Sequence, residues 1–388
     1  MRFREVIELL KDTGNAPVVL EGRRPKQQVL CAPSLVGRTM TTTYDASNGD
    51  ALGWIGVAAI QKGPVDPVFN NFGGEDRFWF GPEGSQFGLH FGSKEQTMAN
   101  YRVQSGMSSQ PYEVVTVSPS RDFVVMKTRM HLENARKTQF DVEVQRTVRV
   151  SDSCPYTMGY SNKLQWVGFQ TESIVTNLSQ RGIEKETGVL SAWTPGLHPN
   201  SSNCVVVLPF RSGSNAELGE PIRRDYFKDL CLDGNLPQER WKTFTDHALM
   251  KADGKFRVKV GIGIRRARNL LGGLNLDAGE LTLNDCELYP EMDYVSPYWR
   301  QLSQKELFDG EALSAYIDGP DQNGQRAGDF YELETLSPAL TLLPGESFLH
   351  RNRVYHVKGD FGEIDRICRT FLKTSIHEVH DFLVEKSN

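Results

Sequence analysis

Residues 71–91 of the chain read NFGGEDRFWFGPEGSQFGLHF. Glycines open this stretch, and Glu75–Phe80 can alternate as a strand, with successive side chains on opposite faces. Glu75, Arg77 and Trp79 would then share one face. Carboxylate and guanidinium groups hydrogen-bond hydroxyls, and an indole stacks on the C–H face of a sugar ring. The stretch therefore predicts one of two arrangements. The three side chains form a surface that binds sugars, or, as spacing alone favours, an ion pair lies on a sheet surface beside a partly buried tryptophan.

The composition of the 388-residue chain is that of a globular protein with a sizeable core, since 39% of its residues are hydrophobic and 24% are charged. Lys and Arg number 44 against 49 Asp and Glu, which gives a net charge of −5. This balance lacks the basic footprint of a nucleic-acid-binding protein, and no long apolar run predicts a membrane span. We therefore expect neither nucleic acid nor a membrane as a partner.

The N-terminal segment MRFREVIELLKD has no apolar core of the kind that signal peptides carry. The chain as given is therefore predicted to be cytoplasmic, or secreted or periplasmic if a leader was removed. Its six cysteines lack the paired spacing of a zinc site, and we expect buried free thiols at Cys31, Cys154, Cys204, Cys231, Cys286 and Cys368.

Motifs for cofactors are missing from the sequence, which has no Gly-rich nucleotide-binding element and no G-x-S-x-G element. We expect neither a cofactor nor a metal. The loop Asp318–Asn323 offers oxygen donors that suit a cation such as Ca²⁺. A solvated turn is the preferred interpretation of this loop, because Asx and Gly residues favour turns for local reasons.

A hydrophobic period of two persists from Val29 to Tyr355, and 35 glycines and 19 prolines punctuate it as turns. The pattern predicts an all-β fold of antiparallel strands, Val29–Thr43 and Trp54–Ile60 among them. Apolar residues at helical spacing predict short helices in residues 1–15 and 358–388. No linker or repeat is evident, so we expect one domain spanning residues 1–388.

Two further segments are candidates for the border of a site. Ser93–Gln110 is polar and long for a structureless connection, which is typical of a lid or a loop beside a binding site. In Lys255–Arg265 the alternation puts basic side chains on one face, Lys259 among them. That face is either a solvated outer surface or one wall of a trough for anions or hydroxyls.

The segment Phe330–Pro338, FYELETLSP, places two carboxylates close together. Glu332 and Glu334 lie two positions apart, so in a strand they share a face with Cα atoms roughly 6–7 Å apart. Two carboxylates that close repel when ionised, which raises one pKa toward the range useful for general acid–base catalysis. The alternative is a pair of glutamates on a solvent-facing strand.

The chain resembles the galactose mutarotase-like (aldose 1-epimerase-like) superfamily, and within it most closely an uncharacterised bacterial family. The segments that carry the resemblance are GGEDRFWFGPEG, KVGIGIRRA, SAYIDGP and FYELETLSPALTLLPGESFLHR. The resemblance implies a large antiparallel β-supersandwich with a sugar-binding groove on a concave face. It also implies a sugar or oligosaccharide as the ligand.

Mutarotases use a late-strand glutamate as the general base and histidines as the acid and sugar ligand. Leu333-Glu334-Thr335 matches their Leu-Glu-Thr-Gln motif except at the last position, so the resemblance assigns the base to Glu334. At the point that matches the acid, the chain has Ser191 or Trp193, and the nearest histidine is His198. The missing histidine argues against simple mutarotation, which needs both a proton donor and an acceptor.

Two main hypotheses for the function remain open: an enzyme that epimerises or otherwise processes a sugar, and a binding module that holds a glycan without chemistry. A purely scaffolding role would fit if the tryptophans lay in separate core regions. The sequence does not define the oligomeric state. The predicted catalytic residues are Glu334 and Glu332, and the predicted substrate-binding residues are Glu75, Arg77, Trp79, Trp193, Lys259 and Trp299.

Overall fold

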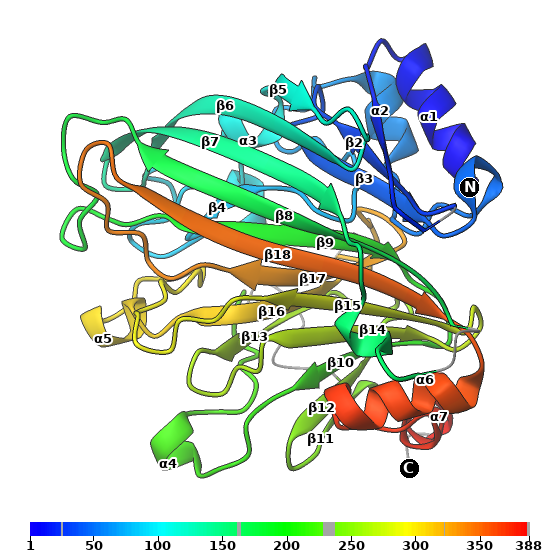
Figure 1. The fold of residues 1–388 in the computed structure, drawn as a ribbon. Coiled ribbons are helices and arrows are strands. Elements are labelled where there is room, and N and C mark those ends of the chain that lie inside the picture. Colours follow the sequence, from blue (N-terminus) through cyan, green and yellow to red (C-terminus); the bar gives the residue numbers. More distant parts are fainter. Residues whose placement is uncertain (25, 161–163, 228–236, 322, 386–388) are drawn as a thin grey trace.

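The computed structural model describes residues 1–24, 26–160, 164–227, 237–321 and 323–385, and is built mainly of antiparallel strands (Figure 1). One of the predicted thiols, Cys231, lies outside the described residues. The other five cysteines are free and buried, as the sequence predicts.

The larger of the two main sheets has ten strands, and every neighbouring pair is antiparallel. In Gln139–Val150 buried side chains alternate with more exposed ones, because one face packs on the core and the other meets solvent. In spatial order the strands are β11 (Trp241–Thr243), β12 (His247–Lys251), β10 (Cys204–Pro209), β14 (Leu270–Asn275), β15 (Glu280–Cys286), β18 (Ser347–Lys358), β8 (Gln165–Asn177), β7 (Gln139–Val150), β6 (Phe123–Glu133) and β5 (Glu113–Val117).

The second main sheet has five antiparallel strands and lies behind the larger one in Figure 1. Side chains from both sheets share a core cluster, in which Val206 and Leu271 of the larger sheet join Val260 and Leu333 of the smaller one. The smaller sheet is covered on both faces, so even its polar side chains are buried. Its strands in spatial order are β13 (Val258–Gly263), β16 (Glu311–Ile317), β17 (Phe330–Leu336), β9 (Ser191–Pro199) and β4 (Trp79–Gly81).

A third, three-stranded sheet forms the N-terminal part of the molecule, with β1 (Val18–Glu21), β2 (Gln28–Ala32) and β3 (Arg38–Thr43). Helix α1 (Phe3–Asp12) buries Phe3, Val6 and Leu10 in a small separate cluster with this sheet and α2 (Val57–Lys62). The three buried positions are spaced by three and four residues, which explains both the helix and the face it buries.

The C-terminal helices pack on the larger sheet at the opposite side of the molecule (Figure 1). They are α6 (Phe361–Ile367), the π-helical turn η7 (Cys368–Leu372) and α7 (Ile376–Val384). The remaining helical pieces are short and lie in connections: α3 (Ser105–Ser108), α4 (Asn215–Leu218), α5 (Gln304–Leu307), η1 (Ala46–Asn48), η2 (Met98–Asn100), η3 (Pro155–Thr157) and η6 (Gln238–Arg240). None of the described helices is long and apolar enough to cross a membrane.

The predicted all-β class is confirmed, with 38% strand and 16% helix and short helices at both ends. Three predicted strands are wrong in detail. The segment Val29–Thr43 is two strands joined by a turn, and Trp54–Ile60 leads into helix α2, because a short apolar run fits a buried helix as well as a strand. Of Glu75–Phe80, only Trp79 and Phe80 belong to a strand, the three-residue β4.

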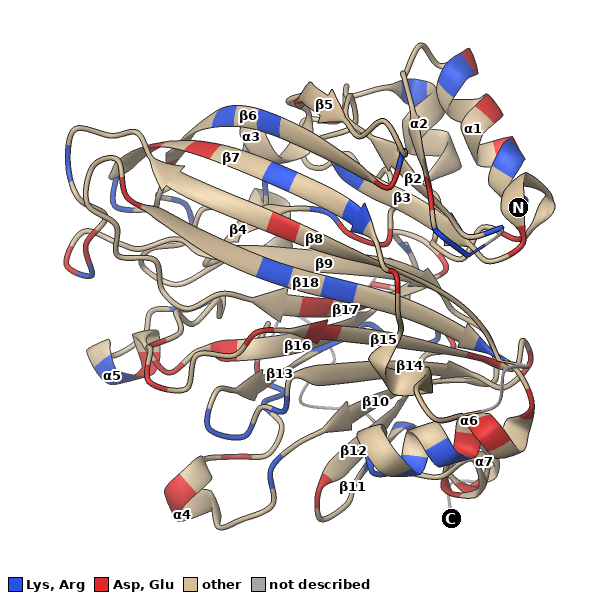
Figure 2. Ribbon diagram, viewed as in Figure 1, with Lys and Arg blue, Asp and Glu red and all other residues tan. Residues whose placement is uncertain are grey.

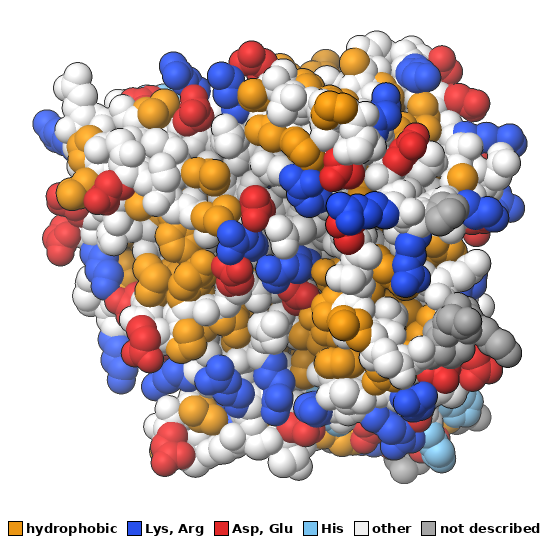
Figure 3. Space-filling model, viewed as in Figure 1, with side chains coloured by type: hydrophobic (Ala, Val, Ile, Leu, Met, Phe, Trp, Pro, Cys, Tyr) orange, Lys and Arg blue, Asp and Glu red, His pale blue; other side chains and the backbone are white. Residues whose placement is uncertain are grey.

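The solvent face of the larger sheet carries both signs of charge. Figure 2 shows basic and acidic residues interspersed along β7, β8 and β18, and Figure 3 shows the same mixture on the surface. Arg351 pairs with Glu172 at 2.9 Å and Arg353 with Asp285 at 2.9 Å across neighbouring strands. Partly exposed pairs of this kind contribute about 0–1 kcal/mol each to stability.

Candidate functional site

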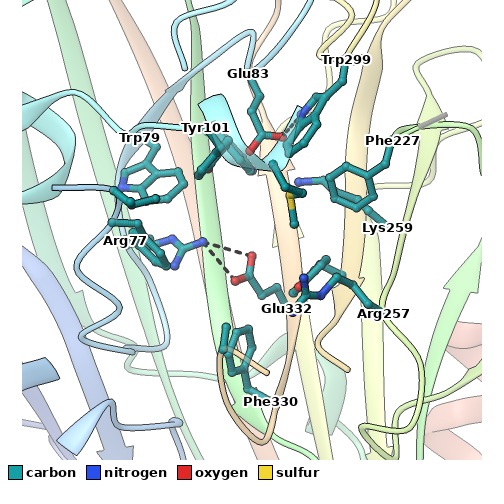
Figure 4. Close-up of a pocket in the computed structure, with 16 residues that line it drawn as sticks. Arg77, Trp79, Glu83, Tyr101, Phe227, Arg257, Lys259, Trp299, Phe330 and Glu332 are labelled. Carbon is teal, nitrogen blue, oxygen red and sulfur yellow. Dashed lines mark hydrogen bonds and ion pairs between the residues drawn. The ribbon is translucent and has the colours of Figure 1, made fainter. Parts of the chain in front are cut away.

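A cavity of about 210 Å³ borders the five-stranded sheet (Figure 4). Each of the five strands contributes at least one side chain to its wall: Trp79 from β4, Trp193 from β9, Lys259 from β13, Tyr316 from β16, and Phe330 and Glu332 from β17. Loops supply the rest of the lining, namely Val68, Phe69, Arg77, Glu83, Met98, Tyr101, Phe227, Arg257, Trp299 and Ala327. The volume is below the ~300–1,000 Å³ typical of sites for drug-sized ligands, so it suits a single ring.

Arg77 and Glu332 form an ion pair at the wall of this cavity. Nη2 of Arg77 donates to both carboxylate oxygens of Glu332, at 3.0 and 3.2 Å. The guanidinium carbon lies 4.1 Å from the ring centre of Trp79 and 5.3 Å from that of Phe69, so two aromatic rings fix its plane. Atoms Nε and Nη1 of Arg77 are buried and make no hydrogen bond to described residues. The arginine therefore keeps donor capacity that the surrounding protein does not use.

The carboxyl group of Glu332 is the most unusual acid of the cavity. Burial raises the pKa of Glu332 to about 7, with Arg77 opposing this rise and the nearby Glu334 adding to it. A group with this pKa exchanges its proton near neutral pH, which is the property that general acid–base catalysis requires.

Glu334 lies two residues further along β17 and is completely buried. Its carboxylate oxygens accept from Nζ of Lys259 at 2.8 and 3.0 Å, and one of them also accepts from the indole of Trp193 at 2.8 Å. The Lys259 ammonium also lies 4.3 Å from the ring centre of Trp193 and 4.6 Å from that of Tyr226. Glu334 is thus held behind the cavity wall by two residues that line the cavity.

A third carboxylate, Glu83, enters from the loop that follows β4. Its Oε2 accepts from the indole of Trp299 at 3.1 Å and from the hydroxyl of Tyr226. Burial acts to raise the pKa of Glu83, but Lys259, His90 and these two hydrogen bonds outweigh it, so the pKa lies below its usual value. The cavity therefore holds two acidic groups whose pKa values are shifted in opposite directions.

Glu75 does not share a surface with Arg77, and the prediction that it borders the same site is wrong. Its carboxylate accepts from the backbone and hydroxyl of Thr42 and lies 3.0 Å from Nε2 of His356 on β18. The next residue, Asp76, pairs with Arg146 and accepts from Thr171 and Asn352 at 2.9 Å each. Glu75 and Asp76 thus both bond to β18 of the larger sheet, whereas Arg77 lines the cavity, because residues 75–78 do not form a strand that would alternate their side chains.

The other predicted site residues lie together. Arg77, Trp79, Trp193, Lys259, Trp299 and Glu332 all line the cavity, and Glu334 contacts two of them. Met98 and Tyr101 come from the polar segment Ser93–Gln110, which the sequence predicts to border a site. Of the basic side chains predicted to share one face of Lys255–Arg265, Arg257 and Lys259 line the cavity, whereas Lys255 is exposed.

Sequence reasoning missed Glu83, Tyr101, Phe227 and Phe330 as cavity residues. Glu83 stands inside the segment GGEDRFWFGPEG, and its place directly after Gly81-Pro82 was the signal that a turn brings it back toward β4. The three aromatic residues carry no individual signal, because a ring that lines a cavity has the same sequence pattern as a ring in the core.

His198, the histidine nearest to the position of the missing acid, does not line the cavity, and neither does His90. His198 is buried and lies 5.5 Å from His356 between ring centres, and burial lowers its pKa well below the usual value. His90 stacks on Tyr101 at 5.3 Å and lies behind the aromatic wall. In the loop Asp318–Asn323, Asp318 accepts from two backbone N–H groups and the hydroxyl of Tyr316, and it pairs with Arg257 at 3.4 Å. Within the described residues, no cluster of His, Cys, Asp and Glu suits a metal ion.

Comparisons with known proteins support the fold and do not identify an activity. The profile of the family of unknown function DUF6786 matches residues 1–383. No curated protein matches the chain. A proposed aldose 1-epimerase from Escherichia coli K12 has a similar structure, with a TM-score of 0.54, 11% identity, and coverage of 88% of this chain and 99% of that one. A galactose mutarotase-like protein from Lactobacillus casei ATCC 334 gives a TM-score of 0.47 at 12% identity, covering 88% and 100%.

Proposed function

Because the chain belongs to this family of unknown function, we propose its activity from the site itself: the protein binds one sugar ring in the cavity and moves protons on it. The observation that carries the proposal is Glu332, a carboxyl group with a pKa of about 7 in the wall of a cavity lined by aromatic rings. Its class of reaction is the opening, closing or epimerisation of a sugar ring by general acid–base catalysis.

The lining of the cavity supports a sugar as the ligand. Indole and phenyl rings stack on the apolar C–H faces of a pyranose, and Trp79, Trp193, Trp299 and Phe330 supply such rings to the cavity wall. Sugar hydroxyls need donors and acceptors at the ring edge, and Arg77 and Lys259 with Glu83 and Glu332 provide both. The resemblance of the fold to aldose 1-epimerase-like proteins agrees with this chemistry.

A non-catalytic glycan-binding module is the second candidate. Such modules present aromatic rings on an open groove, where an oligosaccharide can lie. Here the exposed fractions of Trp79, Trp193 and Trp299 are 2%, 3% and 5%, and all three belong to one core cluster. Because the three tryptophans lie in one cluster, a purely scaffolding role for the protein is disfavoured. The raised pKa of Glu332 favours an enzyme over a non-catalytic binding module.

Thermal-shift measurements against a panel of monosaccharides and oligosaccharides test the proposal. A ligand present at 100 times its Kd stabilises the folded state by about 2.7 kcal/mol. At about 2.1 cal/mol/K of unfolding entropy per residue, 1 kcal/mol corresponds to about 1.2 °C for 388 residues, so Tm should rise about 3 °C. We expect the rise with at least one monosaccharide and a smaller rise in Glu334→Gln, which leaves Lys259 without its carboxylate partner.

The exposed Glu8 supplies a matched control, since Glu8→Gln makes the same chemical change on the outer face of α1. Its ligand response should equal that of the wild type. A panel in which no sugar raises Tm would contradict the proposal, and a response to long oligosaccharides alone would favour the binding module.

A further inference from the structure

We propose that the sugar bound in the cavity carries a protonated amino group, and that this ammonium group pairs with the carboxylate of Glu83. The inference rests on the proposed function and narrows its substrate class to amino sugars. Glu83 lines the cavity beside Trp299, and Figure 4 shows its carboxylate on the side opposite Glu332. A cation at this point would lie between a buried negative charge and several aromatic rings.

The positive side chains that line the cavity are already paired. Each of the three described cations in its wall has a carboxylate partner: Arg77 pairs with Glu332 at 3.0 Å, Arg257 with Asp318 at 3.4 Å and Lys259 with Glu334 at 2.8 Å. Glu83 makes no ion pair with any residue that the structure describes. Glu83 is thus a carboxylate in excess over these cations.

The charge of Glu83 is buried as well as unpaired. The residue is 5% exposed, and burial acts to raise its pKa, yet Lys259, His90 and two hydrogen bonds hold this pKa below its usual value, so the carboxylate is ionised near neutral pH. The ammonium of Lys259 compensates this charge only in part, because it donates to both oxygens of Glu334. His90 is neutral near pH 7, because burial lowers its pKa. A buried carboxylate without a full counter-charge is unfavourable, and a cation on the ligand would relieve it.

Aromatic rings lie next to the carboxylate of Glu83. The indole of Trp299 donates to its Oε2 at 3.1 Å, and the hydroxyl of Tyr226 donates to the same oxygen. Tyr101 stacks on Trp299 at 5.5 Å between ring centres, and Phe227 meets Trp299 edge to face at 4.9 Å. Tyr101, Phe227 and Trp299 all line the cavity. Ring faces attract organic cations, so a carboxylate among such rings favours an ammonium group.

A metal ion suits this environment less well than an ammonium group does. Hard metal ions such as Ca²⁺ take several oxygen ligands at once. Within the parts of the chain that the structure describes, no group of His, Cys, Asp and Glu could hold a metal ion. An ammonium group needs fewer fixed partners, since it hydrogen-bonds one carboxylate and contacts ring faces with the rest of its surface.

The other side of the cavity explains why the cation would be part of a sugar. Arg77 keeps Nε and Nη1 free of hydrogen bonds to described residues, and Glu332 adds acceptor oxygens, so both suit ring hydroxyls. The cavity of about 210 Å³ suits a single ring, so the ammonium group must be carried on that ring. An amino sugar satisfies both sides at once, with hydroxyls at Arg77 and the ammonium group at Glu83.

Binding of matched sugars tests the inference: glucosamine against glucose, galactosamine against galactose, and mannosamine against mannose. Each pair differs in one group, an ammonium in place of a hydroxyl. Calorimetry gives the Kd values, and thermal unfolding gives the rise in Tm. We expect at least one amino sugar to bind the wild type with a Kd about tenfold or more below that of its parent, because hydrogen bonds to charged groups are the stronger ones. At equal saturating concentrations a tenfold difference adds about 1.7 °C to the rise in Tm.

The variant Glu83→Gln removes the negative charge and keeps an oxygen that accepts from Trp299 and Tyr226. The preference for the amino sugar should fall to about onefold in this variant and persist in the surface control Glu8→Gln. A tenfold preference that survives in Glu83→Gln overturns the inference. Parent sugars that bind the wild type as tightly as amino sugars also overturn it, and their binding leaves the proposed function standing.

Should Glu83→Gln not fold, proton uptake by the wild type decides. Calorimetry in two buffers of different ionisation enthalpy counts the protons taken up on binding, at a pH above the pKa of the free amino group. An amino sugar that binds as an ammonium ion takes up about one proton more than its parent sugar does, because its amino group must be protonated in the cavity. Equal uptake by the two sugars overturns the inference.

If no sugar of either kind binds, the proposed function fails, and a probe without a sugar ring then decides on Glu83 alone. Tetramethylammonium chloride is compared with sodium chloride at equal ionic strength. A rise in Tm with tetramethylammonium that Glu83→Gln loses and Glu8→Gln keeps supports an ammonium site at Glu83. No rise, or the same rise in Glu83→Gln, overturns it.

Discussion

Replacing Lys259 by methionine removes one member of a buried ion pair and tests how the site is held together. Lys259 is 4% exposed and Glu334 is completely buried, so neither charge is solvated once its partner is lost. Removing one partner of such a pair costs about 3–5 kcal/mol, because the remaining charge stays buried without compensation. With about 1.2 °C of Tm for each kcal/mol in a chain of 388 residues, we expect Lys259→Met to lower Tm by about 4–6 °C.

The double variant Lys259→Met/Glu334→Met distinguishes the cause of this loss. It removes both charges together, and apolar side chains of similar volume often replace a buried ion pair without loss. The indole of Trp193 then loses its acceptor, which costs about 1 kcal/mol. We therefore expect the double variant to recover most of the Tm that the single variant loses.

The matched control is Lys255→Met on the same chain segment. Lys255 lies 3.8 Å from Asp253 with 71% of its side chain exposed, and pairs of this kind are worth about 0–1 kcal/mol. Thermal unfolding of the four proteins is followed by circular dichroism. A Lys259→Met variant no less stable than Lys255→Met, or a double variant no better than the single one, would refute the argument from desolvation.

Two further predictions concern the residues that join the layers of the fold. Burial acts to lower the pKa of His356, but Glu75 and Glu280 raise this pKa to about 10, above the value of 6.5 in the unfolded chain. The protonated His356 therefore contributes its full stabilisation below about pH 6.5, and this stabilisation is lost as the pH rises through about 10. The Tm difference between the wild type and His356→Gln should narrow over that range, and a constant difference would contradict the assignment. Gly73→Ala should lower Tm more than Gly345→Ala does. Both glycines have φ near +80°, but only a Cβ at position 73 would meet a backbone oxygen, that of Trp54, at 2.2 Å. Equal losses of Tm in the two variants would show that the backbone shifts to relieve this close contact.

Of the site, the sequence predicted the cavity residues that belong to regular strands better than those in loops. Glu332 and Lys259 lie on strands, where alternation decides which face a side chain takes, and both line the cavity. The same rule failed for Glu75, because residues 75–78 have no strand geometry. Tyr101 lies in a segment that the sequence predicts to border a site, but no local pattern identifies which of its side chains reaches the cavity.

The sequence by itself determined the class of the fold, because side-chain periodicity is a local property. A period of two requires strands with one buried face, and the spacing of Phe3, Val6 and Leu10 requires a helix with one buried stripe. Only the tertiary structure decided the site. Arg77 meets Glu332 across 255 positions of sequence and Glu75 meets His356 across 281, so two residues only two positions apart serve different parts of the molecule. Whether a carboxylate is buried, and which cation or indole it meets there, depends on how the sheets and loops pack, and that burial is what raises the pKa of Glu332 to about 7.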